Sequence, residues 1–198
     1  MWQTVLGAVL AALLSVTSTP PAASPPASSS SSSAAVSAPG QRFWVKDKHR
    51  YESPWYAGAR RKMIGYGCTR APYYSPDPRC RDNRGFHHGL DIAMPCGTRL
   101  FAGFRGRVAD PASAGAPGPA YGHKAFRIRN RRKDVDVVIG HARRVYVDPG
   151  DRVRTGQLLA RASDAGAPDG CHLHFEVRPV AGGYQSAVRP HEYLMLRR

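Results

Sequence analysis

Apolar and polar residues alternate over short stretches in the second half of the chain, which is typical of half-buried β-strands. Residues 171–177 show this best, because every second side chain is apolar and the opposite face carries His172, His174 and Glu176. No long helical period runs through the domain, which leaves room only for a short helix within residues 41–64. Further runs rich in β-branched and aromatic residues lie at 100–102, 106–108, 125–129 and 135–139. The pattern predicts an all-β domain with long loops.

The N-terminal segment has a different pattern. Residues 5–16 form an apolar run with the length of a signal-peptide core, too short to span a bilayer comfortably. No Lys or Arg precedes this run, so an uncleaved membrane anchor is the alternative. Residues 17–40 are nearly all Pro, Ala, Ser and Thr and cannot bury enough apolar surface to fold. We therefore expect a signal peptide over residues 1–24, a disordered linker over 25–40 and a secreted protein.

The rest of the chain divides at its first histidine-bearing segment. We expect residues 41–84 to form an N-terminal extension that includes a long loop tied down covalently. We expect residues 85–198 to form a single catalytic domain. Long ordered loops are usually functional, and residues 66–86 look like such a loop.

Four cysteines lie in the region after residue 40, at Cys68, Cys80, Cys96 and Cys171. An even number of cysteines in an exported protein predicts two disulfides. Three pairings are open, and short-range closure favours Cys68 with Cys80 and hence Cys96 with Cys171. A four-cysteine zinc site is disfavoured because the sequence contains no C-x-x-C pair.

The charge of the chain is strongly positive. It has 29 Lys and Arg against 14 Asp and Glu, a net charge of +15, and no charged side chain precedes Arg42. Such an excess favours polyanionic partners, including nucleic acid, anionic lipid and acidic cell-wall polymers. A secreted nucleic-acid-binding protein is one hypothesis. However, we expect the basic run at residues 129–133 to form a solvated hairpin turn.

Three segments contain residues suited to metal chemistry. His87 and Asp91 flank a glycine, and a bent backbone there can direct both side chains to one point. His172 and His174 share one strand face, with Cα atoms about 7 Å apart. A lone histidine, His141, ends an apolar strand. Each segment alone is also compatible with surface or structural histidines.

Together, these motifs resemble the lysostaphin/LytM family of zinc endopeptidases. The matching motifs are H-x-G-x-D at residues 87–91, Gly-His at 140–141 and H-L-H-F-E at 172–176. Weaker similarity extends over about residues 85–194. The resemblance implies an antiparallel β-sandwich core that binds one Zn²⁺ per chain. It implies the zinc ligands His87, Asp91 and His174.

The resemblance also implies that His141 and His172 are catalytic. His88 occupies a variable position of the first motif and is interpreted as a bystander. Glu176 is assigned a role in supporting the ligands. The family usually has an aromatic residue where this chain has Ile139, so we expect one supporting hydroxyl to be missing.

The function implied is a secreted zinc metalloendopeptidase that hydrolyses cross-links or stem-peptide bonds of bacterial peptidoglycan through a zinc-activated water. The alternative is a catalytically silent relative that binds the cell wall or activates other hydrolases. The absence of H-E-x-x-H argues against chemistry with a glutamate base. Expected partners are peptidoglycan and anionic wall polymers, with no nucleic acid. We expect a monomer that is cell-wall associated, without stable membrane association after signal cleavage.

Overall fold

The structure is a computed structural model that describes residues 40–198. The expected signal peptide and all but the last residue of the expected linker lie outside the described residues. Strands dominate the described part, and its one α-helix is the four-residue α1. The strands are β1 (Arg50–Ser53), β2 (Tyr56–Ile64), β3 (Gly67–Thr69), β4 (Gly85–His87), β5 (Leu90–Ala93), β6 (Arg99–Phe101), β7 (Gly106–Val108), β8 (Phe126–Asn130), β9 (Val135–Gly140), β10 (Ala142–Arg143), β11 (Arg152–Val153), β12 (Leu158–Ala162) and β13 (His172–Pro179), and the helices are η1 (Pro119–Tyr121), η2 (Tyr184–Ser186) and α1 (His191–Leu194).

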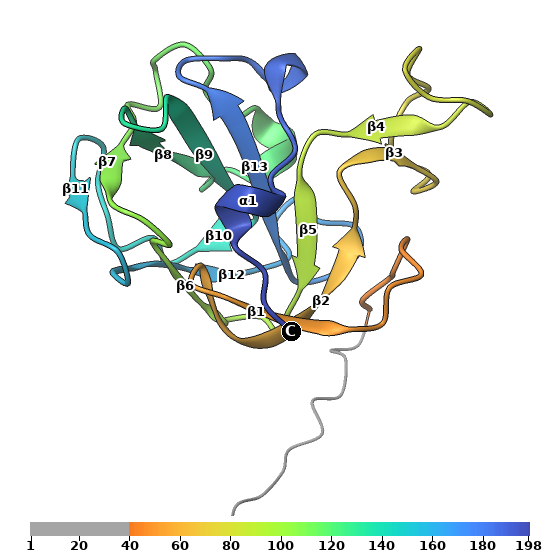
Figure 1. Cartoon of the computed structure of the whole chain (residues 1–198), viewed down its shortest axis with the longest axis horizontal. Coiled ribbons are helices and arrows are strands. Elements are labelled where there is room, and N and C mark those ends of the chain that lie inside the picture. Colours follow the sequence, from red (N-terminus) through yellow and green to blue (C-terminus); the bar gives the residue numbers. More distant parts are fainter. Residues whose placement is uncertain (1–39) are drawn as a thin grey trace, which may run out of the picture. The chain divides into compact units, whose positions relative to one another are not determined.

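One large antiparallel sheet organises residues 40–198 (Figure 1). Its strand order is β10-β12-β6-β2-β5-β13-β9-β8-β7-β11, and β1 pairs with β2. Strands β3 and β4 form a separate two-stranded sheet. The all-β, antiparallel prediction is confirmed, and the segment with the clearest alternation became the central strand β13.

The sheet curls so that strands from both of its ends contribute to one apolar core. Trp55 is the largest side chain in this core and is fully buried. Its ring packs edge-on against Phe104 and Phe175, each at 4.9 Å between ring centroids. Its Nε1–H donates to the carbonyl of Tyr193 at 2.8 Å, so its one polar group is satisfied.

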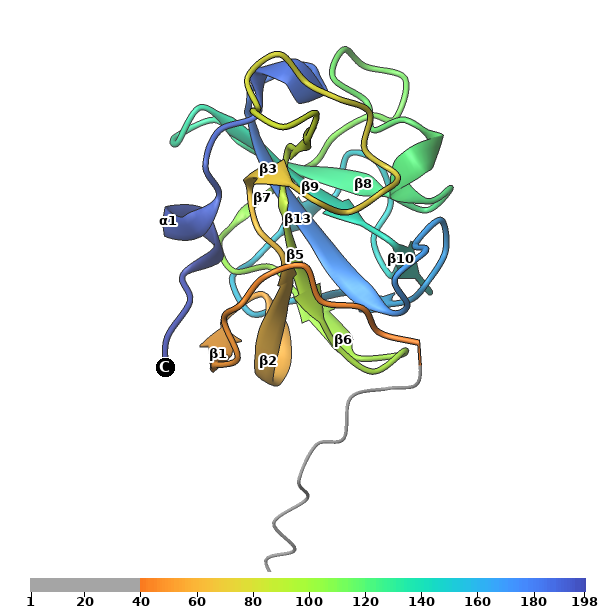
Figure 2. The same cartoon turned by 90° about the vertical axis from the view of Figure 1, so that its right-hand side faces the viewer.

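Residues before position 85 form part of the same sheet. Strand β2 pairs with β1 along one side, and different parts of its other side pair with β5 and β6 (Figure 2). The short helix for which residues 41–64 left room is absent, because β1 and β2 occupy most of that segment. Pairing with neighbouring strands satisfies the backbone polar groups that a helix would otherwise have satisfied internally.

Covalent links close two loops. The disulfides are Cys68–Cys80 and Cys96–Cys171, the pairing that short-range closure favours. All four sulfurs are thus oxidised, which leaves no thiolate for a cysteine zinc site.

Within residues 40–198, no helix has the length and apolarity needed to cross a membrane. Of the basic run at residues 129–133, residues 131–133 lie in the exposed turn of the β8–β9 hairpin as expected, whereas Arg129 and Asn130 belong to β8.

Candidate metal centre and active site

Three strands bring together the residues of the first and last histidine motifs. His87 ends β4, Asp91 lies on β5, and His174 lies on β13. His174 is directly paired with Asp91 across the β5–β13 ladder, so their side chains share one face of the sheet. With His141 and His172, they form a cluster in which every residue is between 1% and 6% exposed.

The donor atoms of His87, Asp91 and His174 fit a tetrahedral metal site. His87 Nε2 lies 3.1 Å from His174 Nδ1 and 3.4 Å from Asp91 Oδ1, and His174 Nδ1 lies 2.9 Å from Asp91 Oδ1. A tetrahedral zinc with bonds of about 2.0–2.2 Å separates its ligand atoms by about 3.3–3.6 Å. Two imidazoles and one carboxylate are also a donor set that zinc accepts. These three residues could therefore hold a zinc ion.

Outer hydrogen bonds set which nitrogen of each imidazole is available. His87 Nδ1 lies 2.9 Å from the carbonyl oxygen of Gly65, which can only accept a hydrogen bond. Nδ1 therefore carries the proton, and the unprotonated Nε2 can bind a metal. His174 Nε2 lies 3.1 Å from the carboxylate of Glu176, which leaves Nδ1 directed toward Asp91. Such outer partners orient the imidazoles of metal sites.

The ionisable residues of this cluster strongly shift one another's pKa values, because the cluster is buried away from water. Burial opposes ionisation of Asp91, but the neighbouring His87 and His172 outweigh it and hold the pKa of Asp91 well below its ordinary value. Burial also opposes a charged His174. Its hydrogen bonds with Asp91 and Glu176 outweigh that effect and raise the pKa of His174 to about 9. In the absence of metal, a proton therefore occupies the centre of this cluster at neutral pH.

His141 and His172 lie beside the three candidate ligands, with ring centroids 4.4 Å apart. The Nδ1 atoms of both rings donate to carbonyls, His141 to Ala165 and His172 to Gly170, each at 2.8 Å. This arrangement leaves both Nε2 atoms as proton acceptors. Burial, together with His172 and His174, lowers the pKa of His141 to about 3, which keeps that imidazole neutral.

Two glycines make room for His174. A Cβ at Gly89 would lie 2.6 Å from the Cε1 of His174, and one at Gly140 would lie 2.9 Å from its Cβ. Gly89, the glycine of H-x-G-x-D, therefore leaves space for the imidazole of His174, which is far from it in sequence. His141 follows directly and adopts a left-handed backbone with φ 52°, a conformation uncommon for a non-glycine residue. Strained residues of this kind cluster at functional sites.

The sequence analysis missed an extension of this network through Tyr121 and Arg178. The hydroxyl of Tyr121 donates to Glu176 at 2.8 Å, and Arg178 donates to the same carboxylate and to Tyr121. Arg178 could have been found by continuing the period of two along β13. Tyr121 could not, because it comes from the short helix η1, far from β13 in sequence.

The structure corrects the expectation of a missing hydroxyl at Ile139. Side chains alternate along β9, and Ile139 packs into the apolar core, on the face opposite the candidate site. An aromatic residue at this position would direct its hydroxyl away from the histidines. The hydroxyl beside the site belongs instead to Tyr121, whose ring centroid lies 5.0 Å from that of His174.

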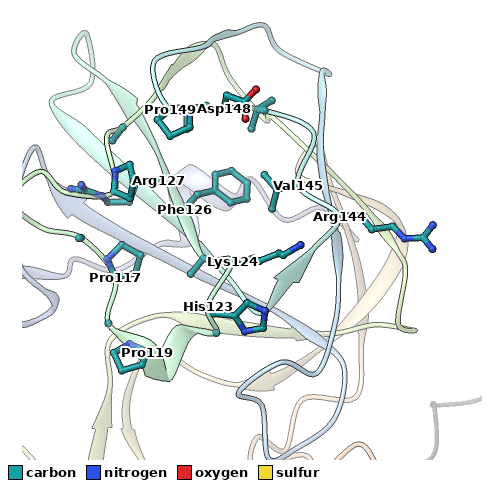
Figure 3. A pocket seen from close by; sticks show the side chains of 18 residues that line it. Pro117, Pro119, His123, Lys124, Phe126, Arg127, Arg144, Val145, Asp148 and Pro149 are labelled. Carbon is teal, nitrogen blue, oxygen red and sulfur yellow. The ribbon is translucent and has the colours of Figure 1, made fainter.

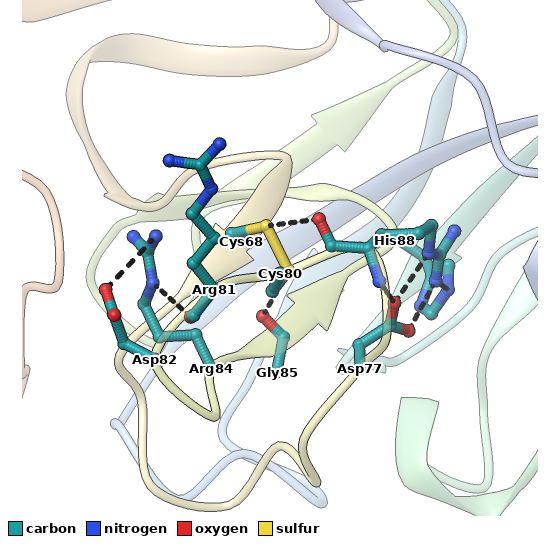
Figure 4. Close-up of a disulfide and its surroundings, with 9 residues drawn as sticks. Cys68, Asp77, Cys80, Arg81, Asp82, Arg84, Gly85 and His88 are labelled. Carbon is teal, nitrogen blue, oxygen red and sulfur yellow. Dashed lines mark hydrogen bonds and ion pairs between the residues drawn. A yellow bond between two sulfur atoms is a disulfide. The ribbon is translucent and has the colours of Figure 1, made fainter.

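A cavity of about 340 Å³ opens onto this cluster. The loop at residues 70–84 forms part of its wall, and the ring of Tyr74 lies 5.4 Å from that of His87. The Cys68–Cys80 disulfide closes this loop (Figure 4). His88 also lines the wall, and Arg79 lies 3.0 Å from its Nε2. The full lining consists of Tyr74, His87, His88, Gly118, Pro119, Ala120, Tyr121, His141, His174 and Tyr184.

The fold of this chain is similar to those of several solved structures. The structure is similar to the catalytic domain of the antimicrobial peptidase lysostaphin from Staphylococcus simulans, with a TM-score of 0.54 at 23% identity over 69% of this chain and 92% of that one. This match concerns the fold. LytU has a TM-score of 0.54 at 25% identity over 68% of this chain and 83% of that one.

A variant of the catalytic domain of the prophage-encoded M23 protein EnpA from Enterococcus faecalis is also similar. Its TM-score is 0.51 at 26% identity, over 71% of this chain and 96% of that one. The model of peptidase family M23 matches residues 85–190, more than half of the sequence. That range contains all five clustered residues, from the end of β4 to β13. The chain therefore belongs to peptidase family M23.

Proposed function

We propose that this chain is a zinc metalloendopeptidase that cuts peptide cross-links or stem-peptide bonds of bacterial peptidoglycan. The observation that carries the proposal is the convergence of His87, Asp91 and His174 at ligand-to-ligand separations of 2.9–3.4 Å, beside two further imidazoles. Membership in peptidase family M23 supports a peptidase activity. The donor set supports zinc, with one ion per chain.

In this proposal the three ligands hold the ion, and Glu176 holds His174 in place. Zinc supplies Lewis acidity, polarising a peptide carbonyl and acidifying water. The Nε2 of His172 lies 3.5 Å from Asp91 Oδ2. Either His141 or His172 can accept the proton of the attacking water through Nε2 or, once protonated, stabilise the developing oxyanion. Burial keeps His141 neutral in the metal-free cluster, and its lowered pKa makes it a weak base there.

The proposed substrate and setting follow from the similarity to lysostaphin, an antimicrobial peptidase, and from the lining of the cavity. The 340 Å³ cavity is lined by aromatic and small residues and can take a short peptide segment. The apolar run at residues 5–16 and the two disulfides support secretion. We propose that the protein acts as a monomer at the cell wall.

The test combines zinc titration with turnover of purified peptidoglycan. We expect the wild type to bind one zinc and to release soluble muropeptides, which mass spectrometry would assign to a specific bond. His172→Ala should keep its zinc and lose turnover by about 10²-fold or more, because a positioned acid–base group contributes about that much. Asp91→Ala should lose the zinc itself.

The matched control is His49→Ala, which removes an exposed histidine paired only with Asp47. This variant should keep zinc and turnover. A folded wild type that binds no zinc and releases no muropeptides would refute the proposal. Full turnover in His172→Ala would refute the role assigned to that residue.

A further inference from the structure

A row of arginines crosses the sheet on the face that carries the candidate site. Arg178 lies on the same face of β13 as His174 and pairs with Asp136 on β9. The paired positions that continue this row on β8, β7 and β11 are Arg129, Arg107 and Arg152. Three arginines therefore stand side by side at the β11 edge of the sheet.

The acidic side chains near the β11 edge do not neutralise the charge of its arginines. Asp136 accepts hydrogen bonds from Arg129 at 2.8 Å and from Arg127 at 3.2 Å, so one negative charge is shared by two guanidinium groups. Arg107 and Arg152 form no ion pair with any of the residues that the structure describes. Like charges directly opposite each other destabilise a sheet. An anionic ligand would offset that cost.

A cavity of about 390 Å³ lies at this edge. Arg107, Arg129 and Arg131 line it, and Asp110 is the one acidic residue in its lining. Arg131 lies in the exposed β8–β9 turn and has no ion-pair partner among residues 40–198. We call the cavity that these three arginines line the arginine cavity.

The wall of the arginine cavity is held in place from inside. The buried guanidinium of Arg127 donates to the carbonyls of Asp110, Ser113 and Ala114, at 3.0, 3.2 and 2.6 Å. These bonds fix the loop that borders the cavity. On the other side, Arg107 donates to the carbonyl of Gly150 at 2.6 Å. The cavity is thus part of the folded structure, in which Arg107 is held by backbone and Arg129 by the carboxylate of Asp136.

A second basic cavity adjoins the first and leads toward the candidate site. It has a volume of about 450 Å³ and shares Val108, Ala109 and Pro149 with the arginine cavity. It adds His123, Lys124 and Arg144, with Asp148 as its one acidic lining residue (Figure 3). At its other end it shares Gly118 and Pro119 with the 340 Å³ cavity over the histidines.

From this arrangement we infer that the arginine cavity binds phosphate groups of a phosphodiester polymer, whose next repeats follow the second cavity toward the candidate site. Guanidinium groups form paired hydrogen bonds with phosphate oxygens, which lysine cannot do. Cations in two adjoining cavities match an anion that repeats along a chain. The inference rests on the proposed function only for its setting, a cell wall that contains such polymers.

A nucleic acid fits this surface less well. Proteins that bind single strands stack bases on exposed aromatic rings. The large exposed aromatic residues of the described chain, Tyr73, Tyr146 and Tyr184, line neither basic cavity. The one aromatic residue in either lining is Phe126, which is partly buried against the apolar core. A single partly buried ring offers no row of platforms on which successive bases could stack.

Calorimetric titration of the zinc-loaded wild type with poly(glycerol phosphate) tests this inference. We expect binding, and we expect Arg107→Gln/Arg131→Gln to weaken it about tenfold or more, because two charge-assisted contacts are lost. The matched control Arg70→Gln/Arg189→Gln removes the same charge from exposed positions outside both basic cavities and should change affinity by less than about threefold. If the first double variant unfolds, Arg131→Gln alone serves, since its side chain lies in an exposed turn.

Several outcomes would overturn the inference: no binding, equal weakening in both double variants, or equally tight binding of duplex DNA. Displacement by inorganic phosphate at an equal concentration of phosphate groups would assign the site to free phosphate instead. Digestion of polymer-free peptidoglycan separates this inference from the proposed function. Arg107→Gln/Arg131→Gln should digest it as fast as the wild type, and polymer binding should persist even in a chain that digests nothing.

Discussion

At the scale of single residues, His174 connects the candidate metal centre to the rest of the fold. Its Nδ1 faces His87 and Asp91, while its Nε2 is bonded to Glu176. Both nitrogens are thus committed, one to the place where a metal would bind and one to a buried carboxylate. The protonation state of this one ring therefore controls whether the three donors can act together.

We predict that zinc competes with a proton at His174. With a pKa raised to about 9, the metal-free site carries a proton below that pH, and zinc must displace it. The apparent zinc affinity should therefore rise about tenfold per pH unit from about pH 7 and level off near pH 9. Titration against a chelator of known affinity at each pH measures this slope. An affinity independent of pH would contradict the prediction.

We predict that Glu176→Gln weakens zinc binding by about 10–100-fold. The substitution preserves the size of the side chain but removes the charge that accepts the Nε2–H of His174 and receives Arg178 and Tyr121. Zinc affinity and thermal unfolding should be measured together. Glu192→Gln, at an exposed position, is the matched control and should leave both unchanged. Unaltered zinc affinity in Glu176→Gln would exclude the supporting role.

At the scale of elements, the two disulfides constrain different parts of the site. Cys68–Cys80 closes the loop that forms one wall of the cavity, with a sequence separation of 12. Cys96–Cys171 joins the segment after β5 to the residue before His172, with a separation of 75. A longer closed loop removes more conformational entropy from the unfolded chain.

We predict that removing the longer link costs more stability. Cys96→Ser/Cys171→Ser should lower the free energy of unfolding by about 4 kcal/mol, and Cys68→Ser/Cys80→Ser by about 3 kcal/mol, because the chain-entropy term grows with loop length. Denaturant unfolding of the two double variants under identical conditions makes the comparison direct. The opposite order would show that native contacts around Cys68 and Cys80 outweigh loop entropy.

At the scale of the whole molecule, the region that matches the family model is not sufficient to complete the sheet. The match begins at residue 85, yet β2, which precedes it, pairs with both β5 and β6. Trp55, which also precedes the match, is fully buried against Phe104 and Phe175. Loss of a buried tryptophan alone costs about 3–5 kcal/mol, a large part of the stability of a typical domain.

We predict that a chain beginning at residue 85 does not fold, whereas one beginning at residue 40 does. The shorter chain leaves the edges of β5 and β6 unpaired and opens a cavity at Trp55. Circular dichroism and thermal melting distinguish the two chains. A cooperative melt of the shorter chain, at the temperature of the longer one, would show that β1–β3 are dispensable.

The sequence by itself determined the local features: strands where apolar and polar residues alternate, the hairpin turn at its basic run, and the family motifs. These depend on side-chain period and short-range chemistry, which a linear pattern preserves. Only the tertiary structure decided that Tyr121 and Arg178 join Glu176, that Ile139 faces the core, and that β2 lies inside the sheet. Those outcomes depend on strand order and on which distant segments pair, and pairing between distant segments leaves no period in the sequence.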